Sequence, residues 1–187
     1  MAVEALRRVL LVGFMASGKT SVGKELAALL GWDFHDFDTA IEKQAGATVT
    51  EIFRRDGEEH FRDIEAEVAS DLLQKERVVL ASGGGWPAQP GSWEAVPDGT
   101  LSVWLRVSPG VAVRRASSEG LVRPFLAGAQ PQDRAVELMK QRETTYGRAQ
   151  VALDSEQDGP ARLATTIMKI ITSGRVWPLI NIFATNN

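Results

Sequence analysis

The sequence contains no cysteine. This absence excludes a disulfide framework and any metal site built from thiolates, and it fits a reducing compartment. The sequence also has no apolar run long enough to cross a bilayer, and residues 1–8 are not followed by the apolar stretch and small-residue cleavage site of a signal peptide. We therefore expect a soluble cytoplasmic protein with no membrane partner.

Positive charge is not in excess either. The chain has 21 Lys and Arg residues against 24 Asp and Glu residues, for a formal net charge of −3. This balance lacks the basic footprint of a nucleic-acid-binding protein, so any bound anion must be held by a local cluster of Arg and Lys. With 187 residues, 44% of them hydrophobic, and no internal repeat or low-complexity block, the chain fits one globular domain.

Four short apolar runs, each bounded by turn residues, predict buried strands. They are residues 8–13, 78–81, 101–107 and, more weakly, 150–154. Between them, helical patterns cover residues 18–31 and 57–74, and Gly31 is typical of a helix C-terminus. Strands that alternate with helices predict a parallel sheet with helices on both faces.

Two segments fit no strand or helix. Residues 117–133 are rich in Gly, Pro and polar residues and are long for a connection inside a compact domain. Because they contain Arg123, we interpret them as a lid over an active site rather than a tolerated surface insertion. The apolar residues 175–187 follow a helix that could already close the fold, and a tail packed on the body or on a neighbour and a cloning remnant both stay open.

The stretch LLVGFMASGKTSVG, residues 10–23, starts as a strand and ends as a helix. It matches the phosphate-loop motif G-x-x-x-x-G-K-[ST] at Gly13, Gly18, Lys19 and Thr20. Small residues let backbone N–H groups turn towards a phosphate, and the helix N-terminus adds a positive dipole end. In this motif the lysine reaches the β and γ phosphates and the threonine hydroxyl ligates Mg²⁺. The stretch therefore predicts binding of a nucleoside triphosphate, and a chance lysine in a glycine-rich turn is the weaker alternative.

Two carboxylates, Asp36 and Asp38, come at the end of a short predicted strand, residues 33–37. Alternation along a strand would place both side chains on one side. A turn with a helix cap is the alternative, since Asp38 is followed by a helical pattern and could be its N-cap.

Two arginines are candidates for binding an anion. Arg62 lies on a predicted helix with Glu65 one turn on, close enough to orient it, although a solvated ion pair is the simpler explanation. Arg142 interrupts an otherwise apolar helix face, which consists of Ala135, Met139, Tyr146 and Ala149. Since buried arginine is costly unless paired, we expect a carboxylate or an anionic ligand near Arg142.

Three glycines, Gly83, Gly84 and Gly85, follow the predicted strand over residues 78–81. Ligands bind at the carboxyl ends of strands in open α/β sheets, and glycines allow a close backbone approach to a small molecule. A plain turn is the alternative for this run taken alone.

In this order, these pieces resemble shikimate kinases, which are P-loop small-molecule kinases of the nucleoside monophosphate kinase-like group. The resemblance covers about residues 9–171 and is carried by GFMASGKT, FHDFDTAIE, GEEHFRDIE, SGGG, VRPFL and RETTYGRA. It implies a three-layer α/β/α fold of the P-loop NTPase type with a five-stranded parallel sheet of order 2-3-1-4-5. It implies ATP-dependent phosphorylation of the 3-hydroxyl of shikimate, in aromatic amino acid biosynthesis, by a monomer.

The resemblance also implies how the chain is divided. Residues 1–174 would form a single kinase domain, with the phosphate loop at residues 13–20, the acceptor-binding region at residues 36–65 and the lid at residues 117–130.

Site residues follow from the same resemblance. For the nucleotide they are Gly13, Ala16, Ser17, Gly18, Lys19, Thr20, Ser21, Arg114 and Arg123, with Arg115 a competing choice for Arg114. Thr20 and Asp36 would hold Mg²⁺, the second through water. Asp38 would be the base, and Lys19 and Arg123 would complete the catalytic residues, Arg123 by closing over the transferring phosphoryl group. The shikimate site would comprise Asp38, Arg62, Gly83, Gly84, Gly85 and Arg142.

The sequence departs from the family pattern in two places besides the tail. Ala16 stands where the family usually has glycine, so the loop is strained if that position needs a positive φ. Phe125 replaces the usual leucine of the lid.

Three other functions are alternatives for a chain with this phosphate loop. The acceptor-side residues argue against a gluconate kinase, and the presence of Lys19, Asp38 and Arg123 argues against a non-catalytic nucleotide-binding relative. A nucleoside monophosphate kinase is weaker still, because no base-reading pocket can be recognised for its acceptor.

Overall fold

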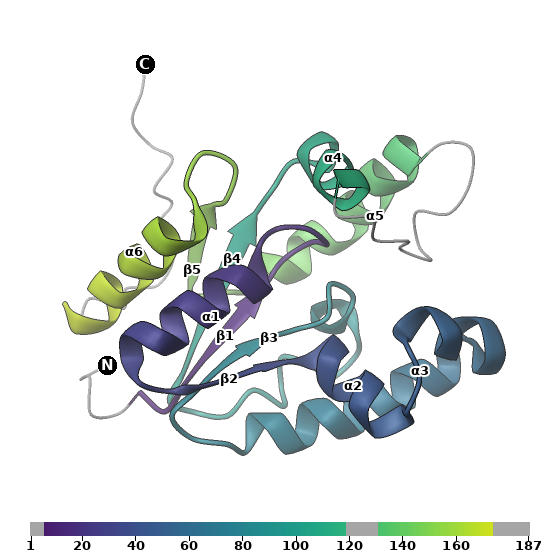
Figure 1. Ribbon diagram of the computed structural model, residues 1–187, viewed down its shortest axis with the longest axis horizontal. Coiled ribbons are helices and arrows are strands. Elements are labelled where there is room, and N and C mark those ends of the chain that lie inside the picture. The colour runs from purple at the N-terminus through teal and green to yellow at the C-terminus, as the bar shows by residue number, and fades with distance from the viewer. Residues whose placement is uncertain (1–5, 119–130, 174–187) are drawn as a thin grey trace.

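The computed structural model describes residues 6–118 and 131–173 (Figure 1). Its strands are β1 Arg8–Val12, β2 Asp33–Asp36, β3 Val78–Ala81, β4 Thr100–Arg106 and β5 Val151–Asp154. They form one parallel sheet of five strands in the order β2-β3-β1-β4-β5. This order confirms the predicted fold class.

The helices are α1 Lys19–Leu30, α2 Phe37–Ala45, α3 Val49–Leu73, α4 Pro109–Ser118, α5 Pro131–Tyr146 and α6 Pro160–Thr172, with a short 3₁₀ turn, η2, at Trp86–Ala88. As predicted, α1 ends at Gly31, which is left-handed with a φ of 64°. The helix predicted to begin at residue 57 begins earlier, at a capping box formed by Thr48 and Glu51. Gly57 is a kink inside it, with a φ of 85° and a ψ of 175°.

Two layers of helices enclose the sheet (Figure 1). Side chains alternate along β1, so Val9 and Leu11 pack into the core shared with α1 and α6, whereas Leu10 and Val12 pack into the core shared with α2 and α3. All four side chains are fully buried. The continuous apolar runs of β1 and β3 therefore reflect a sheet that is covered on both faces.

A third, smaller core lies beyond the carboxyl ends of the strands. It joins Phe14 and Met15 of the phosphate loop to Ala112 of α4 and to Ala135 and Tyr146 of α5. This core positions α5, and with it Arg142, beside the phosphate loop.

Some predictions fall outside the described residues. Arg123 and Phe125, most of the predicted lid and the tail over residues 175–187 are among them, so their roles stay predictions. In the part of the chain that the structure describes, no helix has the length and apolar character of a membrane span.

Candidate active site

The phosphate loop joins β1 to α1 in a conformation that depends on small residues. Gly13 has a φ of 144°, and a Cβ atom built on it would lie 2.5 Å from the carbonyl oxygen of Leu105. Gly18, the N-cap of α1, is left-handed with a φ of 89°. Ala16 also has a positive φ, of 53°, so the glycine that the family usually has there is replaced at a strained position.

Lys19 lies across this loop. Its Nζ atom donates hydrogen bonds to the carbonyl oxygens of Gly13, at 3.0 Å, and Phe14, at 2.8 Å. The ammonium group is therefore held over the loop where the motif requires a positive charge.

Thr20 and Asp36 meet at the mouth of the loop. The Thr20 hydroxyl donates a hydrogen bond of 2.6 Å to Oδ2 of Asp36. The other carboxylate oxygen, Oδ1, accepts from the backbone N–H groups of Asp38, at 3.0 Å, and Thr39, at 3.4 Å. Asp36 is thus the N-cap of α2, which fixes its orientation.

The predicted placement of Asp38 is wrong. The strand stops at Asp36, one residue before its predicted end, and Asp38 belongs to the first turn of α2. The cap is Asp36 rather than Asp38, because the amide groups of the first turn bond to the Asp36 side chain. The two carboxylates therefore take different environments.

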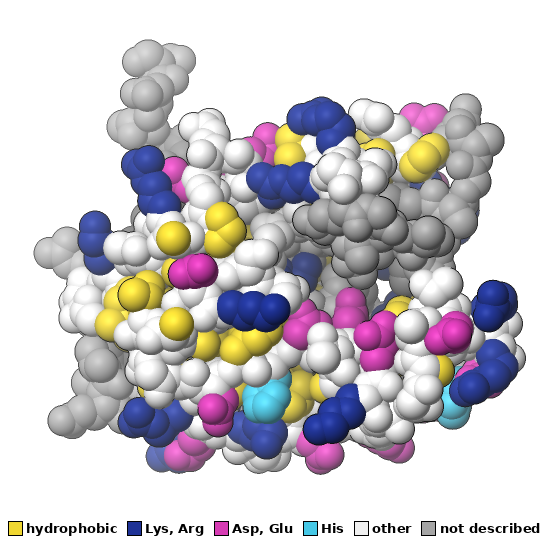
Figure 2. All heavy atoms as spheres, viewed as in Figure 1, with side chains coloured by type: hydrophobic (Ala, Val, Ile, Leu, Met, Phe, Trp, Pro, Cys, Tyr) yellow, Lys and Arg dark blue, Asp and Glu magenta, His cyan; other side chains and the backbone are white. Residues whose placement is uncertain are grey.

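A pocket of about 430 Å³ lies over the phosphate loop. Residues 15–22 form one side of it, Asp36 and Asp38 border it, and residues 155–160 after β5 form another wall. Figure 2 shows a hollow in this face with acidic side chains beside it, and positive and negative side chains interspersed elsewhere on the same face. The hollow has the size and position of a nucleotide site.

A smaller pocket of about 60 Å³ adjoins the first. Its lining consists of Met15, Asp38, Val49, Phe61, Arg62, Glu65, Gly83, Gly84, Gly85 and Arg142. Met15, Asp38 and Gly84 line both pockets. The structure therefore brings together in one cavity the aspartate, both arginines and the three glycines that were singled out in the sequence.

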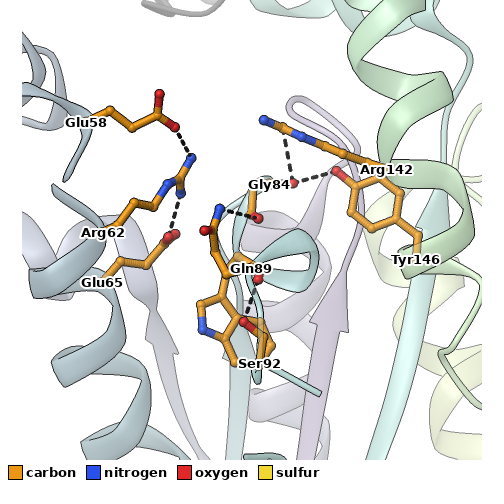
Figure 3. Close-up of polar contacts among 10 residues, drawn as sticks. Glu58, Arg62, Glu65, Gly84, Gln89, Ser92, Arg142 and Tyr146 are labelled. Atoms are coloured by element: carbon orange, nitrogen blue, oxygen red, sulfur yellow. Dashed lines mark hydrogen bonds and ion pairs between the residues drawn. The ribbon is translucent and has the colours of Figure 1, made fainter. Parts of the chain in front are cut away.

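Arg62 and Glu65 form a buried pair on one side of the smaller pocket (Figure 3). Arg62 Nη1 lies 2.5 Å from Glu65 Oε2, and Arg62 Nη2 lies 2.9 Å from Oε1 of Glu58. The side chain of Arg62 is 16% exposed and that of Glu65 is 2% exposed, so the pair is not the solvated ion pair of the simpler explanation. Burial raises the pKa of the Glu65 carboxyl, and the positive charges of Arg62 and Arg142 oppose this rise.

Arg142 and Tyr146 lie on the opposite side, one turn apart on α5 (Figure 3). Arg142 Nη1 donates a hydrogen bond of 3.3 Å and the Tyr146 hydroxyl one of 2.5 Å to the same acceptor, the carbonyl oxygen of Gly84. Burial raises the pKa of Tyr146 to about 12. The arginine that interrupts the apolar face thus faces the glycine run, and its charge acts on the carboxyl group of Glu65, which is a carboxylate of the kind expected near Arg142.

The glycine run lets these side chains approach the backbone. A Cβ atom built on Gly83 would lie 2.6 Å from Oε1 of Glu65, and one built on Gly85 would lie 3.0 Å from Nη2 of Arg62. Any larger residue at these positions would push the buried pair out of place.

The sequence model of the shikimate kinase family matches residues 15–172. The chain belongs to the shikimate kinase family. Among its relatives, the shikimate kinase of Moorella thermoacetica is 39% identical over 163 residues, which are 87% of this chain and 93% of the relative. That of Thermodesulfovibrio yellowstonii is 37% identical over 164 residues, 88% of this chain and 94% of the relative.

Solved structures of shikimate kinases are similar to this chain as well. The shikimate kinase from Acinetobacter baumannii, determined in complex with shikimate, has a TM-score of 0.86 and 34% identity, and the match covers 92% of this chain and 96% of that one. A gluconokinase from Sinorhizobium meliloti, at 21% identity and a TM-score of 0.52, shares the fold alone. Family membership makes the chain an ATP-dependent kinase, with shikimate the acceptor for which the family is named.

The structure distinguishes between Arg114 and Arg115, which both came into question in the sequence, and it adds a segment that was missed. Among the described residues that line the nucleotide pocket, the arginine of α4 is Arg115, whereas Arg114 is exposed. Arg115 donates to the carbonyl oxygens of Ala16, at 3.3 Å, and Ser155, at 2.7 Å, and so bridges the phosphate loop and the segment after β5. The segment after β5, residues 155–160, was missed as a wall of this pocket. The parallel sheet nevertheless places the carboxyl end of β5 at the same edge as the phosphate loop.

Proposed function

We propose that the chain transfers the γ-phosphoryl group of ATP to the 3-hydroxyl of shikimate. The observation that carries the proposal is that the two pockets share Met15, Asp38 and Gly84. A nucleotide in the larger pocket and a small acceptor in the smaller one would meet at these residues, so the phosphoryl group has a direct path between them.

On the nucleotide side, the backbone N–H groups of the phosphate loop and the Lys19 ammonium group bind the phosphates. Residues Gly13, Ala16, Ser17, Gly18 and Ser21 shape this cradle. Ala16 has a positive φ there, and its carbonyl oxygen accepts a hydrogen bond from Arg115. We assign nucleotide contact on α4 to Arg115 in preference to Arg114, since Arg115 lines the pocket.

The residues beside the loop fit magnesium. Thr20 and Asp36 offer a hydroxyl and a carboxylate, which are the hard oxygen ligands that Mg²⁺ prefers. Within the described residues, no group of three or more His, Cys, Asp and Glu side chains could hold an ion by itself, so the phosphates would complete the ligands. When bound, Mg²⁺ would neutralise charge on the phosphates during transfer. Thr20 would ligate it directly and Asp36 through water.

On the acceptor side, Arg62 and Arg142 bind the carboxylate of shikimate. A planar guanidinium group forms paired hydrogen bonds with a carboxylate, and the burial of Arg142 together with the partial burial of Arg62 makes this recognition strong. Gly83, Gly84 and Gly85 form the floor under the ring.

Asp38 is the proposed base, because it lines both pockets. The oxygen of the 3-hydroxyl forms the new bond to phosphorus, the bond from phosphorus to ADP breaks, and the hydroxyl proton passes to the Asp38 carboxylate. Arg123, which lies outside the described residues, is proposed to close over the phosphoryl group, where its charge stabilises the transition state and water is excluded.

The first experiment measures ADP release by the purified chain with Mg²⁺-ATP and either shikimate, gluconate or no acceptor. We expect release that depends on shikimate, and phosphorus–proton coupling in the product that places the phosphate on the 3-oxygen. Release that is independent of the acceptor, or that needs gluconate, would overturn the proposed acceptor and leave the nucleotide site standing.

We further propose that the protein acts in the cytoplasm as a monomer with shikimate as its small-molecule partner and no nucleic-acid or membrane partner. The proposal of a monomer rests on the family resemblance. Sedimentation equilibrium would show a mass near 20.3 kDa, and a dimer mass would contradict this.

A further inference from the structure

Ser82 is a buried residue to which the proposed mechanism gives no role. It directly follows β3 and is 3% exposed. Its backbone N–H donates to the carbonyl oxygen of Leu11 at 3.0 Å, but its Oγ atom has no hydrogen-bond partner among the residues that the structure describes. A buried hydroxyl without a partner costs free energy, so its position calls for an explanation.

The register of the sheet places Ser82 at the junction of the two pockets. Ala81, the residue before it, is paired with Leu11 of β1 on one side and Asp36 of β2 on the other. Ser82 therefore lies between the start of the phosphate loop and the carboxylate at its mouth. It lines the nucleotide pocket, and the next residue, Gly83, lines the acceptor pocket.

We infer that the Ser82 hydroxyl donates a hydrogen bond to the transferring phosphoryl group of ATP. Phosphate oxygens are strong, charged acceptors, and a hydroxyl is a donor that can rotate to meet them. The Ser82 hydroxyl is covered, although the residue lines the nucleotide pocket. Rotation about its Cα–Cβ bond to another staggered rotamer would turn the hydroxyl towards that pocket. In the free enzyme this hydroxyl has no hydrogen-bond partner within the described part of the chain. The bond to the phosphoryl group is therefore gained on binding without the loss of another bond. This inference rests on the proposed function, because it assumes that the phosphoryl group crosses the junction.

The test compares a nucleotide that has a γ-phosphoryl group with one that lacks it. Dissociation constants for ADP and for the β,γ-imido analogue of ATP are measured by calorimetry, with Mg²⁺, for the wild type and for Ser82→Ala. We expect the analogue to bind the variant about tenfold more weakly, the change typical of one lost hydrogen bond to a charged group, and ADP to bind equally well. The kcat should fall about tenfold as well, with the KM for shikimate unchanged.

Two further variants separate this role from a structural one. Ser82→Thr keeps a hydroxyl and should recover binding of the analogue. Ser102→Ala removes another buried hydroxyl, which accepts a hydrogen bond of 3.0 Å from the N–H of Gln150 away from both pockets. It should lower the melting temperature and leave both dissociation constants unchanged, whereas Ser82→Ala should not lower the melting temperature.

Equal weakening of ADP and the analogue by Ser82→Ala, or no weakening of either, would overturn the inference. These outcomes differ from failure of the proposed function, in which the wild type itself would show no ADP release that depends on shikimate.

Discussion

The Tyr146 hydroxyl donates a hydrogen bond of 2.5 Å to the carbonyl oxygen of Gly84. This bond ties α5 to the glycine run at the centre of the acceptor pocket, and Arg142, one turn earlier on the same helix, bonds to the same oxygen. The tyrosine and the arginine therefore share one acceptor, the carbonyl oxygen of Gly84.

Replacing Tyr146 by Phe removes this bond and leaves the ring, which packs on Trp104 at a centroid distance of 5.9 Å. We expect the free energy of unfolding to fall by about 1 kcal/mol, the usual loss for one hydrogen bond. The KM for shikimate should rise severalfold while the KM for ATP changes little, because Gly84 and Arg142 lose a common anchor. Urea unfolding and ADP-release kinetics measure both effects. Unchanged stability and an unchanged KM for shikimate would contradict the anchoring role.

The same residue predicts a response to alkaline pH that can be followed directly. Tyr146 is the only tyrosine among the 187 residues, so tyrosinate absorbance reports on it alone. Burial raises its pKa from 10.0 to about 12. Because the folded pKa exceeds the unfolded value, the contribution of the neutral phenol to stability is complete below about pH 10 and is lost as pH rises through about 12. A spectrophotometric titration of the folded protein with its midpoint near 10 would contradict this, and Tyr146→Phe should lack the alkaline loss.

Glu65 orients Arg62 from a buried position, and Glu58 contacts the same guanidinium group from a side chain that is 58% exposed. This gives a matched pair of variants. Glu65→Gln should raise the KM for shikimate tenfold or more, because a buried charged partner is lost, whereas Glu58→Gln should change it less than about twofold, as for an exposed ion pair. If the two variants change the KM for shikimate equally, the burial of Glu65 does not strengthen its effect on shikimate binding.

Glu65 also predicts a pH dependence of stability. Its pKa is raised by burial, so its contribution to stability is complete below the ordinary range of a glutamate and is lost as pH rises through the raised value. Glu65→Gln should lack this decline between acid and neutral pH. Melting temperatures of the wild type and the variant over that range measure the difference, and parallel curves would contradict the prediction.

Ala16 has a φ of 53° in the phosphate loop. Ala16→Gly should relieve the strain and stabilise the protein by up to about 1 kcal/mol, since the relief exceeds the added entropy of the unfolded chain. The control, Ala28→Gly on the exposed face of α1, should instead destabilise it by about 1 kcal/mol. If both changes destabilise equally, the loop does not strain Ala16.

Asp38 is tested as the base by Asp38→Asn. We expect kcat to fall by about 100-fold or more, the contribution typical of a general base, with a much smaller change in the KM for shikimate. Asp33→Asn, at an exposed position of β2, is the control and should keep full activity. Near-normal turnover of Asp38→Asn would exclude the base while leaving the substrate assignment intact.

Patterns within a few residues predicted much of the fold. The strand-to-helix turn at Gly13 and Gly18, the end of α1 at Gly31 and the buried strands are all visible in the sequence, because each depends on local propensity and periodicity. Arg142 could also be singled out from the local pattern, because a charged side chain on an otherwise apolar helix face is unfavourable wherever that face packs.

Choices between neighbouring residues were not determined in this way. Asp36 and Asp38 are both acceptable helix caps, and Arg114 and Arg115 are both acceptable nucleotide contacts, since each pair has similar local surroundings. The point at which β2 ends decided the cap, since the N–H groups of Asp38 and Thr39 bond to Asp36, and contacts from distant segments hold the chosen aspartate and the chosen arginine. Thr20 of α1 bonds to Asp36, and the carbonyl oxygens of Ala16 and Ser155 accept from Arg115.

The sequence by itself thus determined the fold class, the phosphate loop and a set of residues that line the smaller pocket. The tertiary structure alone decided that the pair formed by Arg62 and Glu65 is shielded from solvent, that Gly84 is bonded from α5, and that the two pockets meet at Asp38. The physical reason is that burial and electrostatic pairing depend on which distant elements pack together, and the parallel order of the strands brings those elements to one edge of the sheet.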